Sequence, residues 1–231
     1  MTDSPTFSII IPVLHEGNII NGLLKSLRCL AAEKPVEIIV VDGSPSQDTL
    51  QVISDETIQR YRCHAGRARQ MNLGAAHALG DILIFLHADT RLPATALARI
   101  QETLQDPRLV GGAFSLQIDS PRFLLKMTAV FSTLRSRMTR APYGDQAIFL
   151  RKSYFDSIGG YRDLPLMEDV ELMRRIKKHK NDIIILPDFV ITSDRRWNQE
   201  GLLYTAFRDT LIIFLYWCGM PAEKLARFYP W

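Results

Sequence analysis

The sequence lacks most of the features that mark specialised classes of protein. Its three cysteines, Cys29, Cys63 and Cys218, are odd in number and have no metal-type spacing, so reduced thiols in a cytosol are expected. The net charge of +3 is too small to indicate a nucleic-acid-binding protein. No low-complexity tract or repeat occurs, and no charged leader precedes an apolar stretch at the start of the chain. These absences argue against secretion and predict a folded cytoplasmic protein.

Several common catalytic motifs are also missing. There is no G-x-x-x-x-G-K-[ST] phosphate loop, and the glycines do not match the G-x-G-x-x-G pattern of dinucleotide-binding proteins. Ser8, Ser44 and Ser193 lack the surroundings of a nucleophile elbow, and the five histidines have no zinc spacing. The sequence therefore disfavours a dehydrogenase, a serine hydrolase and a zinc enzyme.

What the first hundred residues do contain is an alternation of strand and helix patterns. Strands are expected at residues 7–13, 37–41, 59–63 and 81–86, and helices at residues 18–30, 49–53, 66–79 and after Pro93. The strands are almost continuously apolar, which is typical of strands that helices cover on both faces. This pattern predicts an α/β fold with a mainly parallel sheet.

The second half of the sequence is less regular. Strands are expected at residues 110–118, 147–150 and 183–186. Residues 123–138 have the pattern of an amphipathic helix with basic residues, and residues 202–218 that of a strongly apolar helix. No Pro/Gly/Ser-rich linker separates the halves, so we expect one domain with a helical C-terminal extension.

Three acidic signals follow one another along the chain. One apolar strand runs into Asp42-Gly43-Ser44, a later one runs into His87-Ala88-Asp89, and Glu168-Asp169 opens a helical pattern. Ligands of an open parallel sheet bind outside the carboxyl ends of its strands, so the first two acids should meet at one cleft. This arrangement predicts a nucleotide and a metal held together, with the later carboxylate available for proton transfer.

Each signal also has a purely structural interpretation. Asp42 and Gly43 suit an ordinary turn, and Asp89 suits the start of a helix. The acids at 168 and 169 would complement a helix dipole. Asp169, however, shares its helical face with apolar residues (Leu172, Met173, Ile176), where an unpaired charge is costly. That placement favours a functional Asp169.

The complete set of motifs resembles a known family. Ser8-Ile-Ile-Ile-Pro-Val-Leu-His-Glu-Gly17, Val41-Asp42-Gly43-Ser44, His87-Ala88-Asp89 and Glu168-Asp169 are similar to the ordered motifs of family 2 glycosyltransferases of the GT-A fold. The resemblance covers about residues 7–197. Further motifs resemble a bacterial subgroup labelled arsenosugar-biosynthesis-type or radical-SAM/selenodomain-associated glycosyltransferases: Gly66-Arg67-Ala68-Arg69-Gln70-Met71-Asn72, Gly144-Asp145-Gln146, Gly159-Gly160-Tyr161 and Arg195-Arg196-Trp197.

The resemblance implies a domain plan. It implies a GT-A domain at residues 1–197, with a nucleotide-binding half at about 1–106 and an acceptor and catalytic half at about 107–197. Residues 198–231 would form the apolar helical extension.

It also implies roles for individual residues. Pro12 and Glu16 would line the nucleotide site, and Asp42 would contact the nucleobase. Asp89 matches the last acid of the family's D-x-D motif, which binds a divalent metal, whereas His87 replaces the first acid. The nucleotide-sugar site is completed by the remaining members of these motifs (Gly43, Ser44, Arg67, Asn72, Ala88).

The acceptor side follows from the later motifs. Asp169, beside Glu168, matches the general base of the inverting enzymes. Asp145, Gln146, Arg196 and Trp197 would lie on the acceptor or diphosphate side. Arg67 and Arg196 are candidates to offset the charge of the leaving diphosphate, although Arg67 also suits a solvated position in a first helical turn.

The predicted function is an inverting, metal-dependent glycosyltransferase. It would move a sugar from a nucleoside-diphosphate sugar, with UDP the commonest choice in the family, to an acceptor hydroxyl on a small or lipid-linked molecule. Hard oxygen ligands and phosphate favour Mn²⁺ or Mg²⁺. The alternatives are a nucleotidyltransferase on a similar sheet and a non-catalytic sugar-nucleotide-binding protein.

The C-terminal helical pattern has three possible fates. Residues 211–217 are all apolar or aromatic, but the stretch is too short to span a bilayer, which needs about 20 apolar residues. The helix would pack on its own core, form a homodimer, or make peripheral contact with the inner face of a membrane. We expect self-association first and membrane contact second, with the basic residues at 122–137 favouring contact with anionic lipid.

Overall fold

A single eight-stranded sheet forms the centre of the computed structural model, which describes residues 6–31 and 34–229. Its strands, in chain order, are β1 Phe7–Val13, β2 Val36–Asp42, β3 Gln59–Arg62, β4 Ile82–Phe85, β5 Thr90–Arg91, β6 Leu109–Asp119, β7 Phe149–Arg151 and β8 Asp182–Ser193. The spatial order is β3-β2-β1-β4-β7-β6-β8-β5. The predicted strands are all present, and the two-residue strand β5 is an addition.

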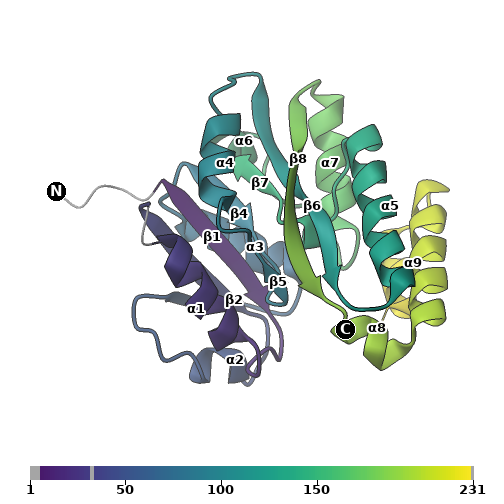
Figure 1. Cartoon of the computed structure of the whole chain (residues 1–231), viewed down its shortest axis with the longest axis horizontal. Coiled ribbons are helices and arrows are strands. Elements are labelled where there is room, and N and C mark those ends of the chain that lie inside the picture. The colour runs from purple at the N-terminus through teal and green to yellow at the C-terminus, as the bar shows by residue number, and fades with distance from the viewer. Residues whose placement is uncertain (1–5, 32–33, 230–231) are drawn as a thin grey trace.

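Ten α-helices are described around the sheet (Figure 1). They are α1 Ile20–Ala31, α2 Asp48–Gln51, α3 Arg67–His77, α4 Ala96–Thr103, α5 Phe123–Thr139, α6 Lys152–Ser157, α7 Glu168–Lys178, α8 Arg195–Glu200, α9 Leu202–Trp217 and α10 Ala222–Leu225. Two 3-10 helices, η1 Gly144–Gln146 and η2 Ala226–Phe228, complete the described secondary structure. As predicted, a helix begins at the acidic pair and another covers the apolar C-terminal stretch.

The N-terminal part of the sheet is parallel and the rest is mixed. β3, β2, β1 and β4 run in one direction, and β6 pairs parallel with β8. β7 is antiparallel to both β4 and β6, and β5 is antiparallel to β8. The sheet is therefore less uniformly parallel than the apolar strand pattern suggested. A continuously apolar strand indicates burial on both faces but does not indicate the direction of the strand. β7 is buried on both faces and runs antiparallel.

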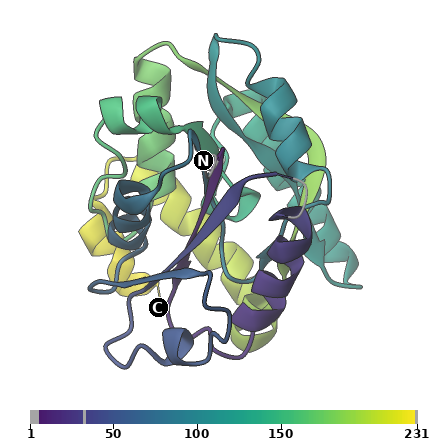
Figure 2. The ribbon, with the colours of Figure 1, turned by 90° about the vertical axis from the view of Figure 1, so that its left-hand side faces the viewer.

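Helices cover both faces of the sheet (Figure 2). One buried cluster joins the sheet to α1, α4 and α5, and a second joins it to α3, α6 and α7. Successive residues of β1 divide between them, since Ile9 and Ile11 belong to the first cluster and Ile10 to the second. This burial explains why β1 carries almost no polar residue.

The C-terminal helices pack around a smaller third cluster. Its buried members are Leu166, Ile212 and Leu225, contributed by the loop before α7, by α9 and by α10. Within residues 6–31 and 34–229, no helix has the length and apolarity needed to cross a membrane.

Candidate active site

The site is built at the carboxyl ends of β1 and β2, where α3 joins them. Gln70 is buried, and its amide Nε2 donates hydrogen bonds to the carbonyl oxygens of Val13 (2.7 Å) and Val41 (2.8 Å). A Cβ at Gly43 would lie 3.0 Å from both Ala65 Cα and the Gln70 side chain. Glycine at position 43 therefore lets the loop after β2 lie close to α3. No role was assigned to Gln70 from the sequence. A polar residue at the start of α3 was the one feature that could have indicated its contact with the strand ends.

Asp42, the last residue of β2, presents an unsatisfied oxygen. Its side chain is buried, and Oδ1 accepts a 2.7 Å hydrogen bond from the Ser44 backbone N–H. Oδ2 is also buried, and no described residue donates a hydrogen bond to it. Burial raises the pKa of this carboxyl group. The backbone N–H groups of Ser44, Leu50 and Thr49 act in the opposite direction and lower this pKa, so they offset part of the cost of burial.

Glu16 follows β1 and is held by an arginine from far along the chain. Arg195 Nη1 and Nη2 donate to its two carboxylate oxygens, each at 2.7 Å. The Glu16 backbone N–H donates to Thr49 Oγ1 at 2.9 Å. Glu16 thus lies just after the carboxyl end of β1, which contains the buried Pro12. Its carboxylate connects the β1–α1 loop to the start of α8.

Asp89 lies in the short turn between β4 and β5. The recorded hydrogen bond to its carboxylate, within the described part of the chain, comes from the neighbouring Thr90 hydroxyl at a long 3.4 Å. Its backbone carbonyl accepts from Ser193 N–H at 3.1 Å, which fixes the turn against β8. The carboxylate is therefore positioned by its backbone and remains available to an outside ligand.

His87 is held as a neutral imidazole. Burial, together with the positive charges of Arg67 and Arg196, lowers its pKa to about 3. A Cβ at Gly144 would lie 2.9 Å from His87 Nε2 and 3.7 Å from Asp169 Oδ2. The segment after β4 and the start of α7 therefore meet at η1, although they are far apart in the sequence.

Asp169 is fixed by two backbone donors. Oδ2 accepts from Gly144 N–H and Oδ1 from Val170 N–H, both at 2.7 Å. The preceding Met167 adopts a left-handed φ of 65°, which turns the chain sharply into α7. A carboxylate has about four lone-pair sites, so both oxygens can still accept a further proton or hydrogen bond. The predicted base is thus oriented by the chain and remains able to react.

Glu168 is the more deeply buried of the acidic pair. It is 4% exposed, and Arg67 Nε lies 3.8 Å from its Oε1. Burial raises the pKa of Glu168, while the positive charge of Arg67 lowers it. Glu168 and Asp169, in turn, raise the pKa of Arg67. Arg67 therefore lies beside the acidic pair and already faces a carboxylate there.

Asp145 supplies the carboxyl group of η1. Its Oδ1 is buried and receives no hydrogen bond from any described residue. Burial, together with the negative charges of Asp169 and Asp89, raises its pKa to about 6, against the opposing effect of Arg135 and Arg196. Asp145 therefore belongs to the same charged cluster as Asp169 and Asp89.

Gln146 and Asn72 have their polar groups satisfied by the protein. Gln146 is buried; Ser136 Oγ donates to its Oε1 at 2.6 Å, and its Nε2 donates to the Phe114 carbonyl at 2.9 Å. Asn72 exchanges two hydrogen bonds with the Tyr161 backbone, at 2.8 and 2.9 Å. Both contacts connect elements around the site, so the geometry favours a positioning role for these two residues.

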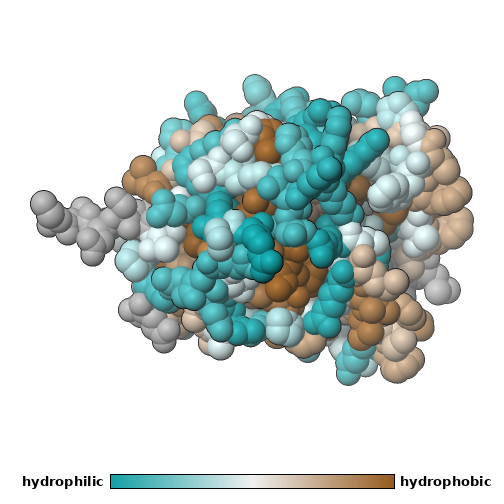
Figure 3. Space-filling model, turned by 90° about the horizontal axis from the view of Figure 1, so that it is seen from above, coloured by the Kyte–Doolittle hydropathy of each residue, from teal (hydrophilic) through white to brown (hydrophobic). Residues whose placement is uncertain are grey.

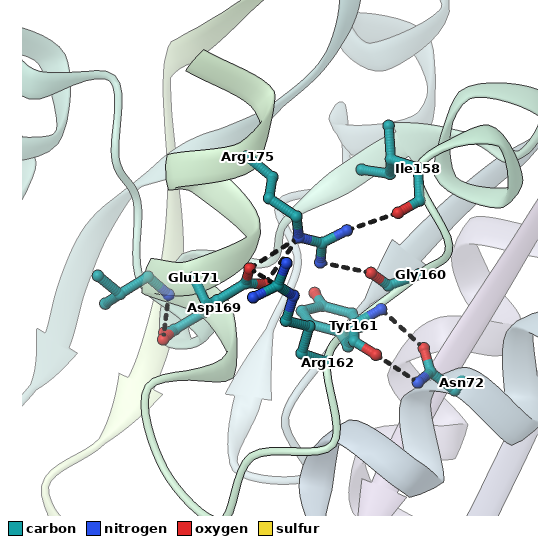
Figure 4. Close-up of polar contacts among 9 residues, drawn as sticks. Asn72, Ile158, Gly160, Tyr161, Arg162, Asp169, Glu171 and Arg175 are labelled. Carbon is teal, nitrogen blue, oxygen red and sulfur yellow. Dashed lines mark hydrogen bonds and ion pairs between the residues drawn. The ribbon is translucent and has the colours of Figure 1, made fainter. Parts of the chain in front are cut away.

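An arginine from α7 holds the same region from the other side (Figure 4). Arg175 Nη1 and Nη2 donate to the carbonyls of Ile158 and Gly160, both at 2.6 Å, and its Nε contacts Glu171 at 2.8 Å. Gly160 has φ 64°, and a Cβ there would lie 2.7 Å from Asn72 Oδ1. These contacts lock the turn before α7 onto α3. The sequence did not reveal Arg175, whose basic character matched the end of a helix.

The Arg196-Trp197 pair lies at the C-terminal side of the site. Arg196 hydrogen-bonds Asp209 of α9 and the Tyr229 hydroxyl, and its charge lowers the pKa values of His87 and Asp145. Trp197 packs against the core cluster of α1, α4 and α5. Arg196 thus contributes positive potential to the cluster, while α9 supplies its partner.

Comparison with known protein families gives a decisive match. The model of "Glycosyl transferase family 2" matches residues 8–162, which is more than half of the chain. The chain belongs to glycosyl transferase family 2. Its matched part includes the Asp42, Asp89 and Asp145 segments of the site, and α7 with Asp169 lies just beyond it.

Relatives of this glycosyltransferase occur in several organisms. The uncharacterized glycosyltransferase Rv1514c of Mycobacterium tuberculosis is 27% identical over 186 residues, covering 76% of this chain and 70% of the relative. The probable glycosyltransferase YdaM of Bacillus subtilis is 25% identical over 227 residues, covering 87% of this chain and 52% of the relative. The chain is thus a family 2 glycosyltransferase, and half of YdaM has no counterpart in it.

Solved structures show the same GT-A fold. The mannosyltransferase PcManGT of Pyrobaculum calidifontis, in complex with GDP-Man and Mn²⁺, has a TM-score of 0.67 and 21% identity, covering 90% of this chain and 61% of that structure. S. aureus TarS 1-349 in complex with UDP has a TM-score of 0.64 and 17% identity, covering 81% of this chain and 60% of that structure. The glycosyltransferase described here therefore spans about three fifths of each of these structures.

Proposed function

We propose that this glycosyltransferase moves a sugar, with inversion and with the help of a divalent metal, from a nucleoside-diphosphate sugar to an acceptor hydroxyl. One observation carries the proposal: His87, from the segment with Asp89, and Asp169 both lie against Gly144. The segment proposed to hold the metal and the carboxylate proposed as base therefore lie next to the same residue. The motifs that contain Arg67 and Arg196 resemble those of the arsenosugar-biosynthesis-type subgroup, and we propose that the chain belongs to this subgroup.

Asp42 is proposed to select the nucleobase. Its carboxylate, at the end of β2, is proposed to accept from a ring N–H such as that of uracil or guanine. Among the structural neighbours, TarS was solved with UDP and PcManGT with GDP-Man. We propose a UDP-sugar as donor, with Pro12, Glu16, Gly43 and Ser44 forming the walls of this part of the site.

Asp89 is proposed to hold the metal together with the donor phosphates. Among the described residues, no group of three or more His, Cys, Asp or Glu side chains could hold a metal ion. Mg²⁺ and Mn²⁺ sites in nucleotide enzymes commonly use one or two carboxylates plus substrate phosphates, and the free carboxylate of Asp89 fits that mode. A bound metal would offset the negative charge of the leaving diphosphate.

Asp169 is proposed to take the proton of the acceptor hydroxyl. The hydroxyl oxygen attacks the anomeric carbon from the face opposite the leaving group, its proton passes to the Asp169 carboxylate, and the nucleoside diphosphate departs. Arg67 and Arg196 add positive charge on the diphosphate side. Because His87 is neutral, it does not reduce the positive charge that Arg67 and Arg196 provide. A negatively charged aspartate at this position would reduce it.

Two variants test these assignments in one experiment. Asp169→Asn is expected to bind UDP with nearly unchanged affinity and to lose transfer by roughly 10²- to 10⁴-fold, because the amide cannot accept the proton. Asp89→Ala is expected to bind UDP with an affinity that no longer rises with Mn²⁺. Calorimetric titration with UDP and GDP, with and without Mn²⁺, is combined with an assay of the released product. Asp81→Asn, an exposed acid away from the site, serves as the control.

The outcomes separate the alternatives. Release of nucleoside diphosphate supports sugar transfer, whereas consumption of a nucleoside triphosphate with release of pyrophosphate would establish a nucleotidyltransferase. Binding of sugar nucleotides without turnover, across a panel of acceptors, would point to a non-catalytic binding protein. Near-normal turnover by Asp169→Asn would remove Asp169 as the base, and an unchanged Mn²⁺ effect in Asp89→Ala would place the metal elsewhere.

A further inference from the structure

Large apolar side chains are exposed at one end of the molecule, where α5 and α9 lie (Figure 1). Figure 3 shows residues of high hydropathy gathered at this end. The six most exposed large apolar side chains of the two helices are each at least 61% exposed: Phe123, Phe131, Met138, Phe207, Phe214 and Trp217. We define these six as the apolar end face. Extensive exposed apolar surface of this kind marks an interaction site.

The spacing of these residues makes each helix one-sided. Phe123, Phe131 and Met138 recur at about two helical turns, so they lie on one side of α5, opposite the buried Leu125 and Ala129. Phe207, Phe214 and Trp217 likewise share one side of α9. The inner sides of both helices pack on the protein, and the outer sides are left for a partner.

The charged residues of α5 and its flanking segments have one sign, although Arg140 is paired with Asp182 of β8. Residues 120–143 contain five basic residues and no acidic one. Arg122 and Lys126 are exposed, and no described residue makes a recorded ion pair with either side chain. On α9 the two charged residues point inward, since Arg208 is 5% exposed and Asp209 pairs with Arg196 and Arg208. The surface is therefore apolar, with the two cations Arg122 and Lys126 beside it at the start of α5.

We propose that the apolar end face docks on the surface of an anionic lipid bilayer. Aromatic residues on an amphipathic helix enter the boundary between headgroups and acyl chains, and neighbouring cations are attracted to anionic lipid. A symmetric contact between two copies fits less well. The six residues of the apolar end face include no acidic side chain, so a second copy would offer Arg122 and Lys126 no acidic partner through this face.

The two helices of this face are directly connected to the proposed acceptor side of the site. Residues 140–143 connect α5 directly to η1, which carries Asp145 and whose Gly144 N–H binds Asp169. The Asp209 partner of Arg196 belongs to α9. An acceptor carried by the membrane therefore suits this geometry, and that consequence rests on the proposed sugar transfer, whereas the docking itself does not.

Vesicle flotation of the intact chain tests the docking without any donor sugar. We expect the chain to float with vesicles of phosphatidylcholine and phosphatidylglycerol, and much less with phosphatidylcholine alone or at high salt. Phe131→Ser with Phe214→Ser should lower partitioning by about tenfold or more, because two exposed aromatic rings are removed. Arg122→Glu with Lys126→Glu should lower it at least about fivefold per cation. These sites are exposed, so folding should be unaffected.

Matched controls lie on other surfaces. Leu79→Ser removes an exposed apolar side chain after α3, and Lys25→Glu reverses an exposed cation on α1; both should float like the parent. A blue shift of tryptophan fluorescence on adding anionic vesicles, absent in Trp217→Phe, would place this face in the lipid. UDP titration without vesicles checks the donor site separately, so the docking and the sugar transfer can fail independently.

Three results would overturn the proposal. The first is no flotation with anionic vesicles. The second is flotation that the end-face variants leave unchanged. The third is a chain that does not bind vesicles but sediments as a dimer, and whose dimer is dissociated by Phe131→Ser with Phe214→Ser. That result would establish self-association through this face.

Discussion

Asp42, Asp145 and Glu168 all have raised pKa values, with burial as the first cause in each case. Asp42 and Asp145 each also have one buried oxygen that accepts no hydrogen bond from the described residues. Such groups reduce stability in the free protein and become useful when a ligand supplies the missing partner. Three costly carboxyl groups among the predicted site residues are therefore a physical sign of a binding site.

The pH dependence of stability follows from the raised pKa of Asp145. Between its usual value of 3.8 and about 6, the folded chain retains a proton that the unfolded chain has released. The contribution of this group to the free energy of unfolding therefore falls by at most about 3 kcal/mol as pH rises through that window. Above the window it stays at this lower value. Asp145→Asn should remove the penalty and raise the free energy of unfolding near pH 8 by about 1–3 kcal/mol, with little gain near pH 4.

Urea denaturation of metal-free protein across this pH range is the measurement. Asp81→Asn, which replaces an exposed carboxyl group, should leave the pH profile unchanged. If Asp145→Asn and the parent lose stability in parallel as pH rises, the Asp145 carboxyl does not carry the penalty. Reduced sugar transfer by the more stable variant would fit a functional role for this costly group.

At the scale of elements, η1 connects the His87-Ala88-Asp89 segment to Asp169 at the start of α7. Gly144 has no room for a side chain, because a Cβ would lie 2.9 Å from His87 Nε2. Gly144→Ala should therefore displace His87 or η1 and shift the N–H that binds Asp169. We expect a loss of stability of about 1–3 kcal/mol and a fall in transfer of up to about 100-fold, since small displacements of catalytic groups are costly.

Gly22→Ala is the matched control for this substitution. Gly22 lies in α1, and a Cβ there would meet nothing within 4 Å. Alanine is the better helix former, so this variant should gain up to about 1 kcal/mol and keep full activity. Thermal denaturation and a product assay on both variants check the prediction. Full activity in Gly144→Ala would show that η1 adapts and that the close approach is not required.

The elements most accessible to sequence reasoning were those with strong periodicity. β1, β2 and β4 were found from apolar runs that end in polar loops, and α7 from an acidic start followed by an apolar stripe. The two-residue β5 and the short α6 carry too few residues for a periodic signal. The antiparallel direction of β7 was also hidden, because a strand buried on both faces looks the same in either direction.

The site was predicted as a list of residues, and its geometry came only from the fold. The sequence placed Asp42 and Asp89 at one edge because strand ends of a parallel sheet converge. It could not indicate that Arg195 holds Glu16, because the two are joined only after the sheet has closed. The same holds for Gln146, whose amide is used by Ser136 and the Phe114 carbonyl. Long-range contacts of polar groups have no local pattern.

At the scale of the whole molecule, both faces of the sheet draw on both halves of the chain. The cluster beneath α1, α4 and α5 includes β1 and also β6 and β8, and the opposite cluster includes β1, β6 and α7. α9 is connected through polar contacts as well, since Arg208 is buried and pairs with Glu200 and Asp209. We therefore expect residues 198–229 to unfold together with the sheet.

Calorimetry of two neighbouring variants tests this cooperativity. Ile212 is 3% exposed in the third cluster, whereas the adjacent Leu211 is 41% exposed. Ile212→Ala should cost about 2–5 kcal/mol and lower a single transition by roughly 2–4 °C per kcal/mol, because the cavity destabilises the whole unit. Leu211→Ala should change it little. A separate low-temperature transition in Ile212→Ala, with the main transition unmoved, would show that α9 melts alone. The membrane-docking face would then be carried by an element that the domain does not hold rigidly.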